Sequence, residues 1–163
     1  MEKKNKPIKR DQHMVELSKD HHAGLLFSWK IKEGLKRNVA TYRLKKYVNY
    51  FWENHLKQHF QEEEALLFNR IDDVLSQQGK TEHLMLASRV KRLNYYENEN
   101  KEEYLLLAEL LIKHIRFEER TLFPFLEKSL PLSALINVKA YLSEQHQVPF
   151  KDNFPDEFWT ELK

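Results

Sequence analysis

Two segments of the chain repeat one arrangement of histidine and glutamate. The segment that starts at His59 and the segment that starts at His114 share the form H-x-x-x-E-E-x-x-L-F. Residues four apart lie on one face of an α-helix, about 6 Å apart along its axis. The pairs His59–Glu63 and His114–Glu118 therefore each place an imidazole beside a carboxylate. Side chains of these two types can bind one transition-metal ion or two adjacent ions.

Two more histidines extend this pattern, because each segment follows another candidate by one helix. His21 or His22 precedes the first segment, and His83 precedes the second. Counting through the turns at roughly 1.5 Å per residue puts each of them at the depth of its partner, about 22–32 Å from the turn. Each half of the chain thus has a lone histidine followed by His-x-x-x-Glu, as in a diverged duplication. Six side chains are expected to converge as metal ligands: His21, His59, Glu63, His83, His114 and Glu118.

Chance and burial decide how much weight the pattern deserves. About one His-x-x-x-Glu pair is expected by chance in a chain with 8 histidines and 19 glutamates. The flanking residues shared by the two pairs, and their apolar neighbours, argue against coincidence. Burying this many imidazoles and carboxylates without a metal would cost on the order of several kcal/mol in lost hydration. A bound metal pair removes that cost, so we predict one in the middle of the bundle.

Two choices among the histidines stay open. His21 continues the apolar stripe that contains Leu17 and is favoured over His22 as the ligand. His55 lies one turn before His59 and either supplies a fifth nitrogen or bonds to a neighbour inside the bundle. The sequence alone does not separate these two roles for His55.

The other histidines and glutamates near the two segments are expected at the surface. His13 and His146 flank the helical region and are interpreted as surface residues. Glu62, Glu64 and Glu119 lie beside the expected ligands, and we interpret them as parts of a solvated helix face.

Apolar residues at helical spacing predict the elements that must position these side chains. Five helices are expected, over residues 13–36, 42–68, 81–98, 101–128 and 131–146. Thr41 is placed to cap the second helix. The stretch 69–80 is ambiguous and ends in Gly79-Lys80, a signal for a helix C-terminus. Short links between long helices predict an all-α fold, an up-down-up-down four-helix bundle with an additional C-terminal helix and tail.

The domain organisation follows from these elements. Residues 1–12 are expected to form a disordered basic tail and residues 13–128 the bundle. Residues 129–163 are expected to pack on the bundle as a helix and an aromatic tail. A chain of 163 residues has the length of one domain.

Composition narrows the function classes. The 27 basic and 25 acidic residues give a net charge of +2, so no strong field favours nucleic acid or an anionic membrane. The absence of cysteine excludes disulfides and thiolate metal sites. No apolar run approaches the ~20 residues of a membrane span, and the N-terminus lacks the apolar core of a signal peptide. We therefore expect a cytoplasmic protein that binds neither nucleic acid nor membranes.

The pattern resembles the hemerythrin-like (HHE cation-binding) domain family. The resemblance covers residues 13–128 and depends on the stretch from Leu17 to His22, on Glu82-His83 and on the two His-headed segments. In that family a four-helix bundle holds a non-haem di-iron centre. The resemblance implies that Glu63 and Glu118 bridge two iron ions. It also implies four terminal ligands: His21, His59, His83 and His114.

Two departures from the oxygen-carrying hemerythrins bear on function. The further histidine of those proteins, one turn after His83, is replaced by Ala87, and their final His-x-x-x-x-Asp is replaced by the pair His114–Glu118. Fewer imidazoles leave more metal positions open, so reversible oxygen carriage is not expected. The resemblance instead implies that the metal centre takes a small diatomic or anionic ligand and binds or reacts with oxygen, peroxide or nitric oxide.

Other functions and other metals stay open. Imidazole and carboxylate ligands also suit Mn or Zn. An iron-responsive regulatory or interaction module is one alternative, and a metal-free structural bundle is another. The sequence assigns no catalytic residue and no protein partner.

Overall fold

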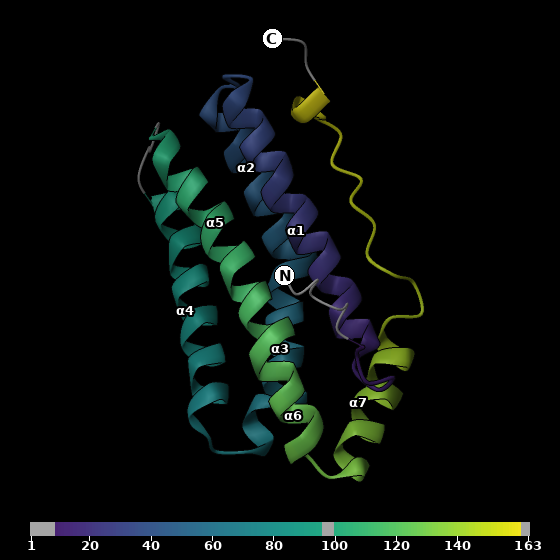
Figure 1. Cartoon of the computed structure of the whole chain (residues 1–163). Helices are drawn as coiled ribbons and strands as arrows, with labels where there is room; N and C mark the ends of the chain where they lie inside the picture. The colour runs from purple at the N-terminus through teal and green to yellow at the C-terminus, as the bar shows by residue number, and fades with distance from the viewer. Residues whose placement is uncertain (1–8, 96–99, 161–163) are drawn as a thin grey trace, which may run out of the picture.

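The computed structural model describes residues 9–95 and 100–160, and within these ranges the chain is helical without a β-strand. The expectation of an all-α fold is therefore confirmed. Figure 1 shows the long helices lying side by side, with the last helix and an extended tail along one side. The α-helices are α1 (Val15–Lys36), α2 (Thr41–Phe51), α3 (Lys57–Leu66), α4 (Val74–Tyr95), α5 (Lys101–Phe117), α6 (Phe123–Ser129) and α7 (Leu132–Gln145).

Two pairs of helices are joined end to end by π-helical turns. The turn η1 (Trp52–Leu56) joins α2 to α3, and η3 (Glu118–Leu122) joins α5 to α6. The residues at these junctions keep right-handed helical backbone angles, so each pair continues as one helix. The expected helices over 42–68 and 101–128 thus exist, each with one wider turn. Such turns occur frequently at functional sites.

Helix α4 begins earlier than expected, at Val74 rather than at Thr81. The Asp73 carboxylate accepts hydrogen bonds from the backbone N–H groups of Leu75 (2.9 Å) and Ser76 (3.1 Å), which caps the helix. The prediction of a helix end at Gly79 is wrong, because this residue lies inside α4 where the helix packs closely against neighbouring side chains. A Cβ atom there would lie 2.9 Å from both Leu122 and Phe68. The expected helix end and turn at residues 96–99 lie outside the described residues.

The turn before α2 depends on the backbone conformation of Asn38 and on a backbone hydrogen bond made by Val39. Asn38 has a φ of 56°, in the left-handed region that asparagine tolerates. The Val39 N–H then bonds back to the Gly34 carbonyl at 3.0 Å. Thr41 is the first residue of α2, and the N-cap position belongs to Ala40 without a side-chain cap. The predicted cap at Thr41 is therefore wrong.

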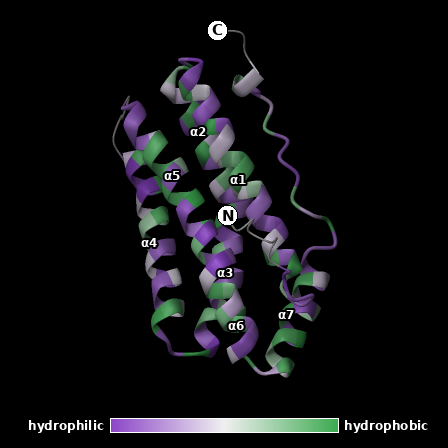
Figure 2. Cartoon of the chain, viewed as in Figure 1, coloured by the Kyte–Doolittle hydropathy of each residue, from purple (hydrophilic) through white to green (hydrophobic). Residues whose placement is uncertain are grey.

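The core consists of two apolar clusters. One cluster includes Phe27, Phe51 and Phe60 and joins α1 to α5; the other includes Leu17 and Phe123 and joins the start of α1 to α6 and α7. Figure 2 shows hydrophobic and hydrophilic positions alternating along every long helix, as an amphipathic bundle requires. Phe60 stacks on His83 with ring centroids 3.9 Å apart, and Phe123 stacks on His21 at 5.2 Å. The histidines predicted as ligands thus contact both clusters.

The C-terminal segment packs on both clusters. Helix α7 buries Leu135, Val138 and Leu142 in the second cluster, and the extended tail runs along α1 (Figure 1) until Phe158 is fully buried in the first cluster. Asp152 fixes the tail, because its carboxylate accepts a hydrogen bond from Tyr47 and forms an ion pair with Lys30 at 2.9 Å.

The start of the described chain is also held on the bundle. The Arg10 guanidinium lies 2.6 Å from Glu127 and 2.8 Å from Glu119, and its side chain is 7% exposed. The expectation of a disordered tail over residues 1–12 is therefore wrong for Arg10, since two carboxylates hold it. Residues 1–8 lie outside the described residues.

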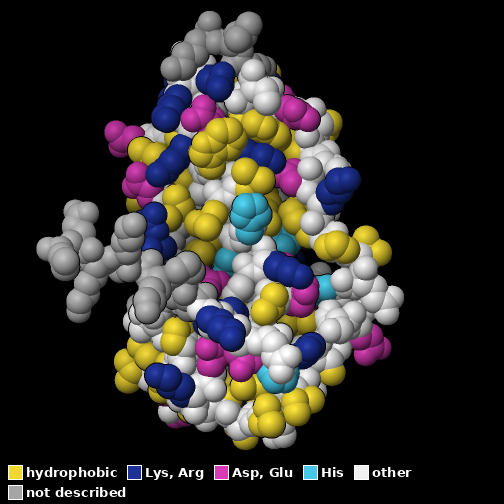
Figure 3. Space-filling model, turned by 45° about the vertical axis from the view of Figure 1, so that its right-hand side comes forward, with side chains coloured by type: hydrophobic (Ala, Val, Ile, Leu, Met, Phe, Trp, Pro, Cys, Tyr) yellow, Lys and Arg dark blue, Asp and Glu magenta, His cyan; other side chains and the backbone are white. Residues whose placement is uncertain are grey.

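The face of the molecule in Figure 3 carries charges of both signs, and the described helices are too polar or too short to span a membrane. Lys and Arg side chains are interspersed with Asp and Glu over the face drawn in Figure 3. Among the helices of the described residues, none combines the length and the hydropathy of a membrane span.

Asp152 gives a test of how the tail is held. Burial opposes its charge, but hydrogen bonds from Tyr47 and Lys30 outweigh burial and lower the pKa of this carboxyl. We expect Asp152→Ala to reduce the free energy of unfolding by about 1.5–3 kcal/mol at pH 7, since it leaves a buried charge unpaired. Stabilisation from a lowered carboxyl pKa exists above the unfolded pKa of about 4 and is lost as pH falls through the folded pKa.

Urea unfolding at pH 7 and pH 3 measures this difference. The gap between the parent and Asp152→Ala should shrink at pH 3. Asp72→Ala, which removes an exposed carboxylate, should change the free energy of unfolding by less than about 0.5 kcal/mol. A gap that is absent at pH 7 would contradict the assignment of Asp152 as the tail anchor.

Candidate metal centre

The six side chains predicted as metal ligands lie together in the bundle. They come from four stretches of helix: α1, α3, α4, and the junction of α5 with η3. Both glutamates are fully buried, and each histidine is at most 4% exposed. His22, the alternative to His21, is exposed to solvent instead.

The six residues form two overlapping groups that could each hold a cation. His21 and His59 belong to the first group, His83 and His114 to the second, and Glu63 and Glu118 belong to both. Within each group, the ligand atoms lie within 4.8 Å of one another. The arrangement therefore suits two adjacent cations that share two carboxylates.

The histidine rings all turn the same nitrogen toward the glutamates. His59 Nε2 and His83 Nε2 each lie 3.1 Å from Glu63 Oε1, and His21 Nε2 lies 2.8 Å from Glu118 Oε2. His114 Nε2 lies 2.5 Å from Glu118 Oε1. The four Nε2 atoms thus face the space around the two central carboxylates.

The opposite nitrogen of each ring contacts an outer carboxylate. The four distances are 2.7 Å for His21 Nδ1–Glu119, 3.0 Å for His59 Nδ1–Asp20, 3.2 Å for His83 Nδ1–Glu64 and 2.8 Å for His114 Nδ1–Glu82. An Nδ1–H that donates to a carboxylate leaves Nε2 free as the ligand atom, fixes the ring orientation and raises the basicity of the ring. The outer carboxylates therefore orient all four rings so that Nε2 faces the central glutamates.

The interpretation of Glu62, Glu64 and Glu119 as a solvated face is wrong. Glu64 and Glu119 are only partly exposed because each contacts a ring nitrogen of a candidate ligand. Glu62 is buried, 5% exposed, and accepts a hydrogen bond from His146 at 2.9 Å. His146 is half-buried by this contact, which corrects its assignment as a surface residue.

The sequence contained a signal for these outer carboxylates. An acidic residue directly precedes each lone histidine, Asp20 before His21 and Glu82 before His83. A second glutamate likewise follows Glu63 and Glu118 in both halves. The duplication therefore extends to the outer carboxylates, and only the pairing across helices had to come from the structure.

Burial and charge oppose each other throughout the centre. Burial favours the neutral imidazole, but the nearby carboxylates of Glu118, Glu119 and Glu63 outweigh it and raise the pKa of His21 well above its usual value. Burial likewise opposes the charged form of His59, yet the attraction of Glu63 and the bond to Asp20 raise its pKa to about 9.

The two central glutamates show the complementary effect. Burial favours the neutral carboxyl in both, and the mutual repulsion of the two glutamates adds to this at Glu63. The attraction of His59 nevertheless lowers the pKa of Glu63. The attraction of His114 lowers the pKa of Glu118 to well below its usual value. The same contacts thus favour the charged form of the imidazoles and of the carboxylates.

Unpaired atoms test whether these residues suit a metal ion. Both oxygens of Glu63, one oxygen of Glu118, and the Nε2 atoms of His21 and His114 are buried without a hydrogen bond of suitable geometry. Buried polar groups are seldom left without a partner, because each unmet group costs about 1–3 kcal/mol. These atoms face one space, and their imidazole and carboxylate chemistry suits Fe, Mn or Zn. The residues present therefore fit a dinuclear metal site.

His55 belongs to neither of the two central groups. It is 6% exposed, its ring stacks on Phe150 with centroids 4.3 Å apart, and its Nε2 has no hydrogen-bond partner. The structure therefore places His55 beside the centre, without the hydrogen bond from Nε2 that an ordinary interior histidine would make.

A family model described as the hemerythrin HHE cation binding domain matches residues 13–126. This match spans most of the chain, so the protein belongs to that family. Comparison with curated proteins and with solved structures finds no match. The family and the buried His and Glu groups agree on a cation-binding domain.

The outer carboxylates can be tested through metal affinity. We expect Glu82→Ala to weaken binding of Fe²⁺ about 10- to 100-fold, since the His114 ring loses the group that orients it. Competition with a chelator of known affinity, under anaerobic conditions, measures the change. Gln78→Ala, which removes an exposed side chain that contacts Glu82 at 2.8 Å, serves as the control. Equal affinity of Glu82→Ala and the parent would show that Glu82 does not orient a ligand.

Proposed function

We propose that this chain is a non-haem di-iron protein of hemerythrin type that binds or reacts with oxygen, peroxide or nitric oxide. The proposal takes His21, His59, His83 and His114 as terminal ligands and takes both buried glutamates as bridges. It also takes the bundle as the up-down-up-down arrangement of four helical segments. Iron is named ahead of Mn or Zn because of the family, and the ligand set is compatible with all three.

One observation carries the proposal. Glu63 and Glu118 belong to both groups of candidate ligands, and no other residue of the described ranges does. Two carboxylates between two pairs of imidazoles suit a dinuclear centre, whereas a mononuclear site would leave two of the histidines without a metal. The outer carboxylates support the same reading because they leave four Nε2 atoms, two for each ion.

The chain itself supplies orientation, charge balance and exclusion of water. A non-haem iron pair, when bound, supplies the binding and redox chemistry for small ligands such as oxygen, peroxide or nitric oxide. Glu119, Asp20, Glu64 and Glu82 hold the Nδ1 protons of the four rings, so that the imidazoles bind in one tautomer. Phe60 and Phe123 are buried and stack on His83 and His21, so two apolar rings lie directly beside the centre.

The number of protein ligands supports small-ligand chemistry. Four imidazoles and two shared carboxylates leave coordination positions for non-protein ligands. Ala87, one turn after His83, offers no nitrogen. Two divalent ions and the two central carboxylates together carry a charge near +2, which favours hydroxide and other anions at the open positions, while the four outer carboxylates add negative charge beyond the imidazoles.

Metal stoichiometry tests this function. Anaerobic loading of the full chain with Fe²⁺, followed by desalting, should leave about two iron ions per chain, one for each group of ligands. Glu63→Ala and Glu118→Ala should each reduce the bound iron, because each removes a ligand shared by both groups. Glu109→Ala, on the same helix as His114 but with a side chain 56% exposed, should load like the parent.

Helical content by circular dichroism separates loss of metal from loss of fold. A parent that keeps its helical content but retains no iron would contradict the proposal and leave a structural bundle. Exposure of the loaded protein to oxygen and, separately, to nitric oxide should change its absorption spectrum. An iron-loaded protein that responds to neither would contradict the proposed small-ligand chemistry.

A further inference from the structure

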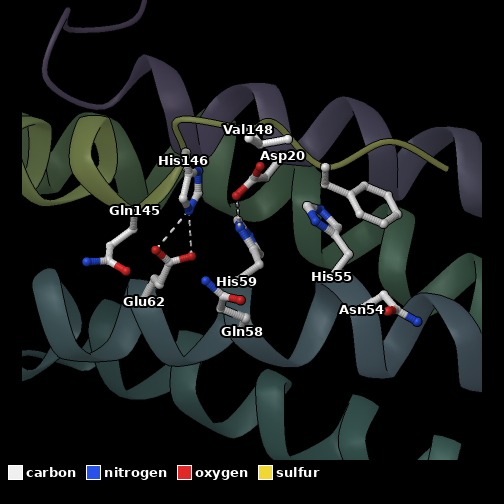
Figure 4. Close-up of a pocket in the computed structure, with 10 residues that line it drawn as sticks. Asp20, Asn54, His55, Gln58, His59, Glu62, Gln145, His146 and Val148 are labelled. Atoms are coloured by element: carbon white, nitrogen blue, oxygen red, sulfur yellow. Dashed lines mark hydrogen bonds and ion pairs between the residues drawn. The ribbon is translucent and has the colours of Figure 1, made fainter.

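A second cluster of metal-ligating side chains lies outside the central pair of groups. It lines a cavity of about 160 Å³ between α1, α3 and the chain that follows α7, shown in Figure 4. Most of its lining side chains carry nitrogen or oxygen, and none of them is Lys or Arg. The cavity is large enough for an ion with several waters, since one water occupies about 30 Å³ in the liquid.

Three side chains converge in this cavity from separate parts of the chain. Asp20, Glu62 and His146 offer ligand atoms that all lie within 4.8 Å of one another. Both oxygens of Glu62 lie 2.9 Å from His146 Nε2, as the dashed lines in Figure 4 show. Both oxygens of the Glu62 carboxylate therefore contact the same ring nitrogen, and a bidentate carboxylate ligand contacts a metal ion in the same way.

Histidines are the only cationic partners that the described lining of the cavity offers to its two carboxylates. Glu62 is 5% exposed and the Asp20 side chain 14% exposed, so two carboxylates are withdrawn from solvent next to each other. Among the described residues no Lys or Arg lines the cavity, so Asp20 is paired only with His59 Nδ1 at 3.0 Å, and Glu62 only with His146 Nε2 at 2.9 Å. Buried carboxylates of this kind are normally paired with cations or bound to metals.

His55 provides an independent indication of a ligand. It lines the same cavity, is 6% exposed, and leaves Nε2 buried without a hydrogen-bond partner. Neither the central groups nor the packing against Phe150 uses this nitrogen. A ligand in the cavity, either a cation or the water that it carries, would use it.

We propose that this cavity is a third cation site, which binds one divalent first-row transition ion through Asp20, Glu62 and His146. Two carboxylates and an imidazole without sulfur suit Mn²⁺, Fe²⁺ or Zn²⁺. The site is separate from the dinuclear centre, although Asp20 connects the two through its contact with His59. The cavity opens at the surface, so this ion exchanges with solvent independently of the central pair. Desalting of the iron-loaded protein therefore removes it and leaves the two central ions.

Equilibrium dialysis of the metal-free full chain against Mn²⁺ tests the third site, with bound metal counted by atomic absorption. Glu62→Gln keeps an oxygen that accepts from His146 but loses the charge, and His146→Ala removes the imidazole. We expect each variant to bind one ion fewer than the parent or to bind that ion at least tenfold more weakly. Glu144→Gln removes an exposed carboxylate two residues before His146 and should match the parent.

The same titration separates this proposal from the dinuclear one. Glu63→Ala should lose the central ions and keep the ion that Glu62→Gln loses. If Glu62→Gln and His146→Ala both bind as many ions as the parent, with equal affinity, the third site does not exist. If either variant loses more than one ion, the cavity is part of the central site, and the proposal of a separate site fails.

Discussion

The burial of Glu63 and Glu118 is the constraint on which the rest of this structure depends. Two carboxylates without solvent contact repel each other, and burial penalises the charge on both. Four imidazoles surround them, and four outer carboxylates hold those imidazoles in turn. Removing any member would leave a neighbour charged and unpaired. A bound metal pair would make the same array a set of satisfied ligands, since the central atoms that now lack hydrogen bonds face one space.

The bundle holds these side chains between closely packed helices and two apolar clusters. Helices α1 and α5 pack closely where Gly24 faces Ile115, since a Cβ at Gly24 would lie 2.8 Å from the Ile115 side chain. One apolar cluster lies on each side of the centre, and each contributes an aromatic ring to a candidate ligand. The π-helical turn that begins at Glu118 widens the helix at the point where this glutamate must face Glu63. Rigid support of this kind keeps ligand atoms in a geometry suited to metal binding.

Much of this arrangement could be predicted from sequence because it depends on periodicity. The i, i+4 spacing and the residue count through the turns place six side chains at one level, and the structure brings all six together. The start of α4 is not predictable from local sequence, because Gly79 is typical of a helix end and its contact with Phe68 is tertiary. The pairing of Glu119 with His21 is likewise tertiary, since it joins residues 98 positions apart. Local patterns determine which face a residue takes, but only the packed bundle determines its partner.

X-ray absorption at the iron edge of the anaerobically loaded protein tests the central claim most directly. Shared glutamates require each iron to have nitrogen and oxygen ligands and a second iron about 3.5–4 Å away. Such an iron neighbour, together with the imidazole scattering expected from four histidines, is the result that this account predicts. Iron ions with no metal neighbour at this distance would contradict it, because Glu63 and Glu118 would then not bridge two ions.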